Sequence, residues 1–248
     1  VLHVRPALDM LDPSQEVILR EISDKVVALT AKYKGLMWGE HGKGFRSEYG
    51  PEFFGDELFT ELRKIKAAFD PFNRLNPGKI CTPFDSDAKL VSVDATKRGS
   101  FDRQIPVAVR QDFTRAIDCN GNGLCFNYDV KSPMCPSFKY TGDRKHSPKG
   151  RAGLMREWLR QMSCQEMNEQ QLGQQLSAQK VNVGNFATRL WNSWNKNQGR
   201  YDFSHEVMDA MQGCLACKAC TVQCPVKVDV PEFRARFIDQ YHSRYLRP

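Results

Sequence analysis

Four cysteines and a proline form the most informative chemical motif of this sequence. Cys214, Cys217, Cys220 and Cys224, the last followed by Pro225, match the spacing C-x2-C-x2-C-x3-C-P. In this pattern the first three thiolates bind one iron–sulfur cluster, and the fourth serves the other cluster of a two-cluster protein. Structural zinc sites usually bring two ligand pairs separated by a longer loop, so the spacing favours an iron–sulfur cluster over zinc.

A second cysteine segment, residues 119–136, repeats this pattern with two changes. Cys119 and Cys125 flank Asn122, which stands where a further cysteine is expected, and Cys135, followed by proline, comes ten residues after Cys125. The glycines on either side of Asn122 suit a chain that folds tightly around sulfur. This segment therefore resembles the other half of a two-cluster ferredoxin with one ligand replaced.

Exchange of the fourth cysteine between the two segments predicts two ligand sets. The first set is expected to hold a 4Fe–4S cluster and consists of Cys135, Cys214, Cys217 and Cys220. The second set has only three thiols, namely Cys119, Cys125 and Cys224. Asn122, water or a nearby residue would complete this second cluster, or it would be a three-iron cluster. Alternatively there is one cluster, and Cys119 and Cys125 are core cysteines.

Composition excludes several classes of protein. The chain has 248 residues, of which 41% are hydrophobic and 26% charged, as in ordinary globular proteins. No stretch approaches the roughly 18 consecutive apolar residues of a membrane span. The net charge of +7 is not gathered into a basic tail, so we expect no nucleic-acid partner. Clustered cysteines indicate metal ligation in a reducing compartment, so we expect a cytoplasmic protein or one peripheral to the membrane.

Hydrophobic periodicity and capping residues predict mostly helices. The expected helices are Ser14–Lys34 with Ser14 as its cap, Phe53–Phe69, Lys149–Met162 and Pro231–Tyr245. Residues 165–200 are rich in glutamine and asparagine, and the glutamine tract suits a solvated helix, while Val1–Val4 alternates like a short strand. Because the chain opens without Met or a signal-peptide pattern, we expect a piece of a longer polypeptide.

A glycine-rich segment, residues 39–44, places Glu40 beside His41. On its own such a pair is more often a surface feature than an active site. Together with His3 and the segments Lys66–Pro71 and Leu75–Lys79, however, it resembles the C-terminal end of the type-4 FAD-linked oxidase family, which contains D-2-hydroxyacid dehydrogenases. The cysteine segments, with His146–Arg151 between them, resemble the helical ferredoxin domain fused to some of these enzymes.

This resemblance implies a domain organisation and a reaction. Residues 1–80 would be the C-terminal part of the substrate or cap domain, 81–110 a linker and 111–248 an α-helical ferredoxin domain. The implied fold class is α+β, mostly α. The implied activity is oxidation of a D-2-hydroxy acid similar to 2-hydroxyglutarate, with electrons passing from FAD through the clusters to an acceptor. An upstream domain of the same polypeptide would bind most of the FAD, and this fragment alone would be inactive.

The resemblance also implies roles for residues of the first segment. His3 and Glu40 would bind a divalent metal such as zinc, and His41 would take the proton of the substrate hydroxyl. Arg5 stands where relatives often carry Asn, and Lys43 where they often carry a small apolar residue. Both cations would favour a substrate with a second carboxylate, or both are simply solvated.

Two other classes of function stay open at this point. One is an electron-carrier subunit similar to those of heterodisulfide reductases, in which His3, Glu40 and His41 are scattered and bind no metal. The other is a zinc-stabilised interaction or nucleic-acid module, which would be colourless and would contain no sulfide.

Overall fold

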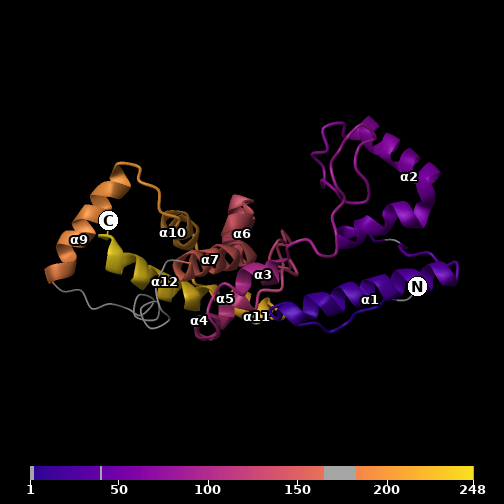
Figure 1. The fold of residues 1–248 in the computed structure, drawn as a ribbon. Helices are drawn as coiled ribbons and strands as arrows, with labels where there is room; N and C mark the ends of the chain where they lie inside the picture. The colour runs from indigo at the N-terminus through magenta and orange to yellow at the C-terminus, as the bar shows by residue number, and fades with distance from the viewer. Residues whose placement is uncertain (1–2, 40, 165–182, 248) are drawn as a thin grey trace. The chain divides into compact units, whose positions relative to one another are not determined.

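The computed structural model describes residues 3–39, 41–164 and 183–247. The chain divides into two compact units, Val1–Arg103 and Gln104–Pro248, whose helices are labelled in Figure 1. The regular structure of the described residues is helical and contains no β-strand, which confirms the mostly α fold. His3 and Val4 have irregular backbone because a lone short segment lacks the paired neighbours that a stable strand needs. Val1 and Leu2 lie outside the described residues.

The first unit contains two long helices and two short ones. These are α1 (Pro13–Lys32), the 3-10 helix η1 (Gly44–Tyr49), α2 (Gly50–Phe69) and α3 (Arg98–Asp102). The predicted cap of α1, Ser14, is wrong. Asp12 caps the helix instead, since its carboxylate accepts the N–H of Ser14 at 2.9 Å, and Pro13 suits the first helical position because it has no N–H to satisfy.

Helix α2 is interrupted at Gly55. This glycine has φ 71° and ψ 166°, a conformation that a residue with a Cβ rarely adopts, so the helix consists of two segments joined at that point. The second segment ends at Asp70, as predicted from the Asp-Pro pair. The Asp70 carboxylate accepts the backbone N–H groups of Arg74 and Leu75, each at 2.8 Å, and so fixes the turn that follows.

A small aromatic core holds the first unit together. Val27, Trp38, Tyr49 and Val93 are buried in it, and Phe53 packs edge-on against Trp38 with ring centroids 5.2 Å apart. Val93 belongs to the segment 81–110 that the sequence suggested as a linker. Residues 81–103 fall within the first unit and residues 104–110 within the second.

The second unit is built around α7 (Pro148–Ser163), which contacts α5, α10 and α12. Among its described residues the other helices are α4 (Val107–Asp112), α5 (Thr114–Ile117), α6 (Pro136–Thr141), η2 (Arg144–His146), α9 (Val183–Asn197), α10 (Ser204–Gln212), α11 (Ala219–Gln223) and α12 (Val230–Arg244). Figure 1 shows α7 beside α10 and α12. The glutamine-rich segment 165–182 lies outside the described residues.

Helices α7 and α12 begin within one residue of the predicted starts at Lys149 and Pro231, and each has a side-chain cap. The Ser147 hydroxyl accepts the N–H of Gly150 at 3.0 Å, and the Asp229 carboxylate accepts the N–H of Glu232 at 3.2 Å. Each helix carries proline in its first turn, where a missing N–H costs nothing. Among the described residues, no helix is both long enough and apolar enough to cross a membrane.

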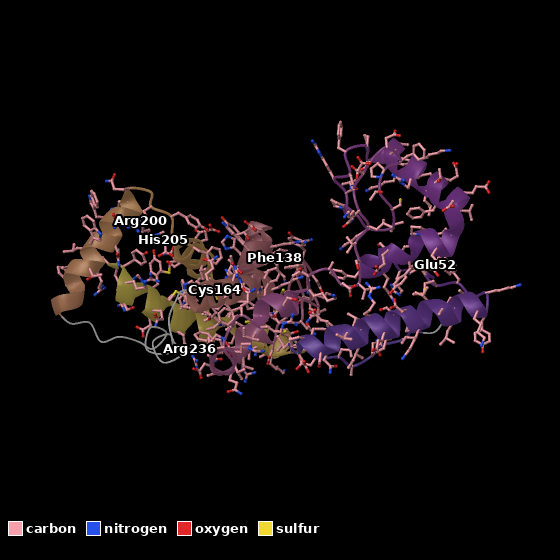
Figure 2. The ribbon with its side chains drawn as sticks, in the orientation of Figure 1. Glu52, Phe138, Cys164, Arg200, His205 and Arg236 are labelled. Atoms are coloured by element: carbon pink, nitrogen blue, oxygen red, sulfur yellow. The ribbon has the colours of Figure 1, made fainter. Side chains whose placement is uncertain are left out.

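Two labelled side chains in Figure 2 show how aromatic groups fill this unit. Phe138 on α6 lies 5.5 Å from the ring of Phe126. His205 on α10 hydrogen-bonds through Nδ1 to the Tyr241 hydroxyl at 2.9 Å and packs edge-on against Tyr245. Burial lowers the pKa of His205.

Candidate functional site

The second unit contains a small pocket lined by four cysteines. They are the cysteines of the first predicted set: Cys135, Cys214, Cys217 and Cys220. Cys135 comes from the turn before α6, Cys214 and Cys217 come from the loop that leads into α11, and Cys220 lies in the first turn of α11. Segments about eighty residues apart in the sequence therefore supply thiols to one cavity.

The backbone bends sharply at this cavity. Cys135 has φ 40°, and within the C-x2-C-x2-C loop Ala216 and Lys218 have φ 53° and 58°. Non-glycine residues rarely occupy this left-handed region, so the surrounding structure must hold them there. Such bends turn a short loop around a common centre, which is the arrangement that three closely spaced thiolates need to wrap one cluster.

A second small pocket lies in the same unit and is lined by three cysteines. These are the thiols of the second predicted set, Cys119, Cys125 and Cys224, and all three are buried. Asn122 also lines the cavity. The glycines on either side of Asn122 have φ 77° and 79°, so the loop depends on residues that accept positive φ.

The first turn of α7 lies between the two cavities. Pro148 lines both of them, Arg151 lines the first and Lys149 lines the second. The N-terminus of a helix carries positive charge, and the two cations add to it. This end of α7 is therefore suited to stand beside two groups of negative charge.

Arg151 is the most deeply buried charge near the first cavity, with 1% of its surface exposed. Its Nη1 lies 3.8 Å from the sulfur of Cys135, and its Nη2 donates to the Ser137 hydroxyl at 2.9 Å. Its Nε donates to the Ala210 carbonyl at 2.7 Å. A buried guanidinium with these neutral partners is stabilised when an anionic group occupies the cavity beside it.

The donor sets fit polynuclear clusters better than single ions. Among the described residues, no three Cys, His, Asp or Glu side chains lie close enough to hold one metal ion. Zinc requires sulfur ligands about 2.3 Å from one centre. An iron–sulfur cluster is instead held by thiolates that bind different irons of the cluster. Burial raises the pKa of Cys125 and Cys220, and iron, when bound, would offset this cost of forming the thiolates.

In the first unit the structure brings two of the predicted site residues together. The rings of His3 and His41 lie 5.4 Å apart and nearly perpendicular, at 79°. Glu40 lies outside the described residues. Arg5 is exposed. The metal and proton-transfer roles of these side chains stay predictions.

The side chain of Lys43 is buried, whereas one alternative from the sequence was that it is solvated. Only 9% of its surface is exposed, and its ammonium lies 4.7 Å from the ring centre of Trp38 and 4.5 Å from that of Phe54. Burial lowers its pKa. It borders two cavities of this unit, one of which also includes Arg46 and Lys97.

Sequence analysis missed Arg151 as a neighbour of the first cysteine set. The residue belongs to the conspicuous segment 146–151, but nothing in the sequence distinguishes it from solvated cations nearby. One signal was available. Arg151 shares the helical face of Met155, Trp158 and Met162, and an arginine on a buried face needs a polar or anionic neighbour.

Comparison with known proteins assigns both units to families. Residues 1–80 match the family described as FAD linked oxidases, C-terminal domain, and residues 115–228 match the 4Fe-4S dicluster domain. The chain thus combines the C-terminal domain of FAD-linked oxidases with an iron–sulfur module of the dicluster type, which confirms the resemblance inferred from the sequence. No solved structure matches the chain.

Individual relatives are more specific. Over its full length the chain is 65% identical to the D-2-hydroxyglutarate dehydrogenase of Escherichia coli (strain K12). It is 64% identical to the protein of that name from Pantoea ananatis and 56% identical to the one from Haemophilus influenzae. It spans 24% of the length of each of these relatives.

Proposed function

We propose that this chain is part of an FAD-dependent, iron–sulfur dehydrogenase that oxidises D-2-hydroxyglutarate or a closely similar D-2-hydroxy acid. The substrate is inferred from the name shared by relatives that match the whole chain. The observation that carries the redox function is the exchange of cysteines. Cys135 lines the cavity of the later motif, and Cys224 lines that of the earlier one, as in a two-cluster ferredoxin.

The two kinds of cofactor would have different roles, since FAD accepts two electrons as a hydride and iron–sulfur clusters transfer one electron at a time. When bound, FAD supplies the acceptor for the substrate hydride, and the clusters supply single-electron steps toward an external acceptor. FAD would be bound mostly by an upstream domain. Cys135, Cys214, Cys217 and Cys220 would hold a four-iron cluster, while Cys119, Cys125 and Cys224 would hold the second one.

The first unit would contribute groups that act on the substrate. A 2-hydroxy acid becomes a 2-oxo acid by losing the hydride on its α-carbon and the proton of its hydroxyl. His41 would accept that proton, for which an imidazole is well suited near neutral pH. His3 and Glu40 would hold a divalent ion such as zinc, which would make the hydroxyl more acidic.

Positive charge in the first unit favours a dicarboxylate as substrate. Lys43 and Arg46 border the same cavity, and Arg5 lies in the segment just after His3. An ammonium or guanidinium group binds a carboxylate through charge-assisted hydrogen bonds. Arg5 and Lys43 would therefore distinguish 2-hydroxyglutarate from monocarboxylic substrates such as lactate. Clustered cysteines favour a reducing compartment, so the enzyme would be cytoplasmic or peripheral to the membrane.

Anaerobic mixing of the full-length protein with D-2-hydroxyglutarate tests this function. We expect the flavin absorption to bleach, followed by reduction of the clusters, and the L-enantiomer or D-lactate to react much more slowly. A protein that contains its clusters but is not reduced by any 2-hydroxy acid would instead be an electron carrier without a dehydrogenase site. A colourless protein without sulfide would contradict the redox function altogether.

A further inference from the structure

The two cysteine-lined cavities differ in their number of thiols. Four thiols line the first cavity and three line the second. The remaining lining residues of the second cavity, among the described part of the chain, include no further cysteine and no histidine, aspartate or glutamate. Iron in protein clusters is held mainly by thiolates, with histidine as the known substitute in one class, so the second cavity offers three conventional ligands.

Asn122 occupies the place of the fourth thiol but uses both ends of its amide within its own loop. Its Oδ1 accepts the backbone N–H of Leu124 at 3.0 Å, and its Nδ2 donates to Oδ1 of Asn120 at 2.7 Å. A neutral amide oxygen is also a poor ligand for iron in a sulfur environment. Asn122 therefore shapes the loop that carries Cys119 and Cys125, and it is not a replacement ligand.

Besides Asn122 and the cysteines, Lys149 is a polar residue that lines this pocket. Its ammonium donates to the carbonyl of Gly121 at 3.4 Å and lies 5.3 Å from the ring centre of Phe126. A protonated ammonium has no lone pair and cannot bind iron. It can compensate the negative charge of sulfide and thiolate groups in a partly buried site. The cation thus stabilises a cluster without completing its ligand set.

We propose that the second cavity holds a three-iron (3Fe–4S) cluster bound by Cys119, Cys125 and Cys224. Among the described residues that line this pocket, no further thiol, imidazole or carboxylate is available to bind a fourth iron. Three thiolates match three irons one to one, so no additional donor is required. This inference deepens the proposed function, because it specifies one of the two clusters on which that function depends.

The test is spectroscopy of the full-length protein, purified without oxygen and enriched in ⁵⁷Fe. We expect about seven irons per chain and, in the oxidised protein, a paramagnetic signal from one three-iron cluster. An oxidised four-iron cluster of the ferredoxin type and oxidised flavin are both diamagnetic, so neither contributes to that signal. Mössbauer spectra should contain three-iron and four-iron components in the ratio of three to four.

Two substitutions at one position sharpen the test. Asn122→Cys supplies the missing thiolate, so the iron content should rise to about eight and the signal of the oxidised protein should disappear. Asn122→Ala removes the amide without adding a ligand and should leave the iron content at about seven. If Asn122→Cys fails to fold, the spectra of the unsubstituted protein and of Asn122→Ala still decide the question.

Three results would overturn the proposal. About eight irons and no signal in the oxidised unsubstituted protein would show that the second cluster has four irons. Loss of one iron in Asn122→Ala would show that Asn122 is a ligand. About four irons would show that the second cavity holds no cluster. Failure of the proposed function is recognised separately, since D-2-hydroxyglutarate would then not bleach the flavin whatever the iron content.

Discussion

The guanidinium of Arg151 lies 3.8 Å from the sulfur of Cys135, and both residues are buried. Cys135 comes from the first cysteine segment but lines the cavity of the second motif. Arg151 thus places a fixed positive charge beside the thiol that joins the two segments. A cation at this position stabilises the more negative, reduced state of a cluster, because Coulomb attraction is strong where water is excluded.

Replacement of Arg151 should make the first cluster harder to reduce. We expect Arg151→Gln to lower its midpoint potential by tens of millivolts, the order of one charge-assisted hydrogen bond. Redox titration followed by low-temperature EPR measures this shift. Arg160→Gln is the matched control, because Arg160 lies on the same helix but pairs with Glu157 at 2.7 Å. Equal potentials for the two variants would contradict the role given to Arg151.

Gly150 is required by close packing at the start of α7. A Cβ at this position would lie 2.1 Å from the carbonyl oxygen of Arg144, a backbone atom that cannot move without shifting η2. We expect Gly150→Ala to destabilise the protein by about 1–3 kcal/mol, as overpacked sites do. Gly153→Ala in the same helix meets no atom within 4 Å and should be neutral or slightly stabilising.

Urea unfolding followed by the loss of cluster absorption compares these two glycine variants. A midpoint for Gly150→Ala equal to that of Gly153→Ala would mean that the close approach to Arg144 does not constrain the fold.

Asp70 should make the stability of the protein depend on pH in the acidic range. The ammonium of Lys66 and the N–H groups of Arg74 and Leu75 lower the pKa of its carboxyl to about 2. In the unfolded chain the pKa would be about 3.9. The folded state therefore binds this proton less readily, so the stabilisation is complete above about pH 4 and is lost as the pH falls toward 2.

The variant Asp70→Asn isolates this contribution. The difference in unfolding free energy between the unsubstituted protein and Asp70→Asn should be constant above about pH 4 and should shrink as the solution is acidified below it. Urea unfolding followed by circular dichroism at a series of pH values measures the difference. A difference that grows on acidification would have the wrong sign for a carboxylate stabilised in its ionised form.

Replacement of His41 should slow the chemical step. If His41 takes the hydroxyl proton, His41→Gln in the full-length enzyme should reduce the rate of flavin bleaching by about 10²–10⁴-fold. Stopped-flow absorption with D-2-hydroxyglutarate measures that rate. Lys64→Gln is a control in the same unit, since Lys64 is exposed and pairs with Glu61. A rate for His41→Gln within about threefold of the control would exclude proton transfer by His41.

The two thiol sets could be predicted from the sequence because the spacing C-x2-C-x2-C-x3-C-P itself determines which cysteines share a cluster and which one serves the other cluster. The starts of α7 and α12 were predictable for a similar reason, since a proline in the first turn marks a helix start locally. In both cases the information lies within a few consecutive residues.

Features that depend on distant residues could not be predicted in this way. Burial of Val93 against Trp38 depends on folding of the whole first unit, so the composition of its segment suggested only a linker. The position of Arg151 next to Cys135 depends on how α7 packs against the turn before α6. Gly55 was equally ambiguous, because a glycine inside an amphipathic pattern marks either a tolerated position or a break.

The most direct test of the exchange of cysteines is to replace Cys135 by serine in the full-length protein and record its EPR and Mössbauer spectra. Cys135 lines the cavity of Cys214, Cys217 and Cys220. We therefore predict that Cys135→Ser loses the four-iron cluster and keeps the signal of the second cluster, as Cys217→Ser should also do. Loss of the second cluster in Cys135→Ser, with the four-iron cluster intact, would contradict the exchange of ligands between the two motifs.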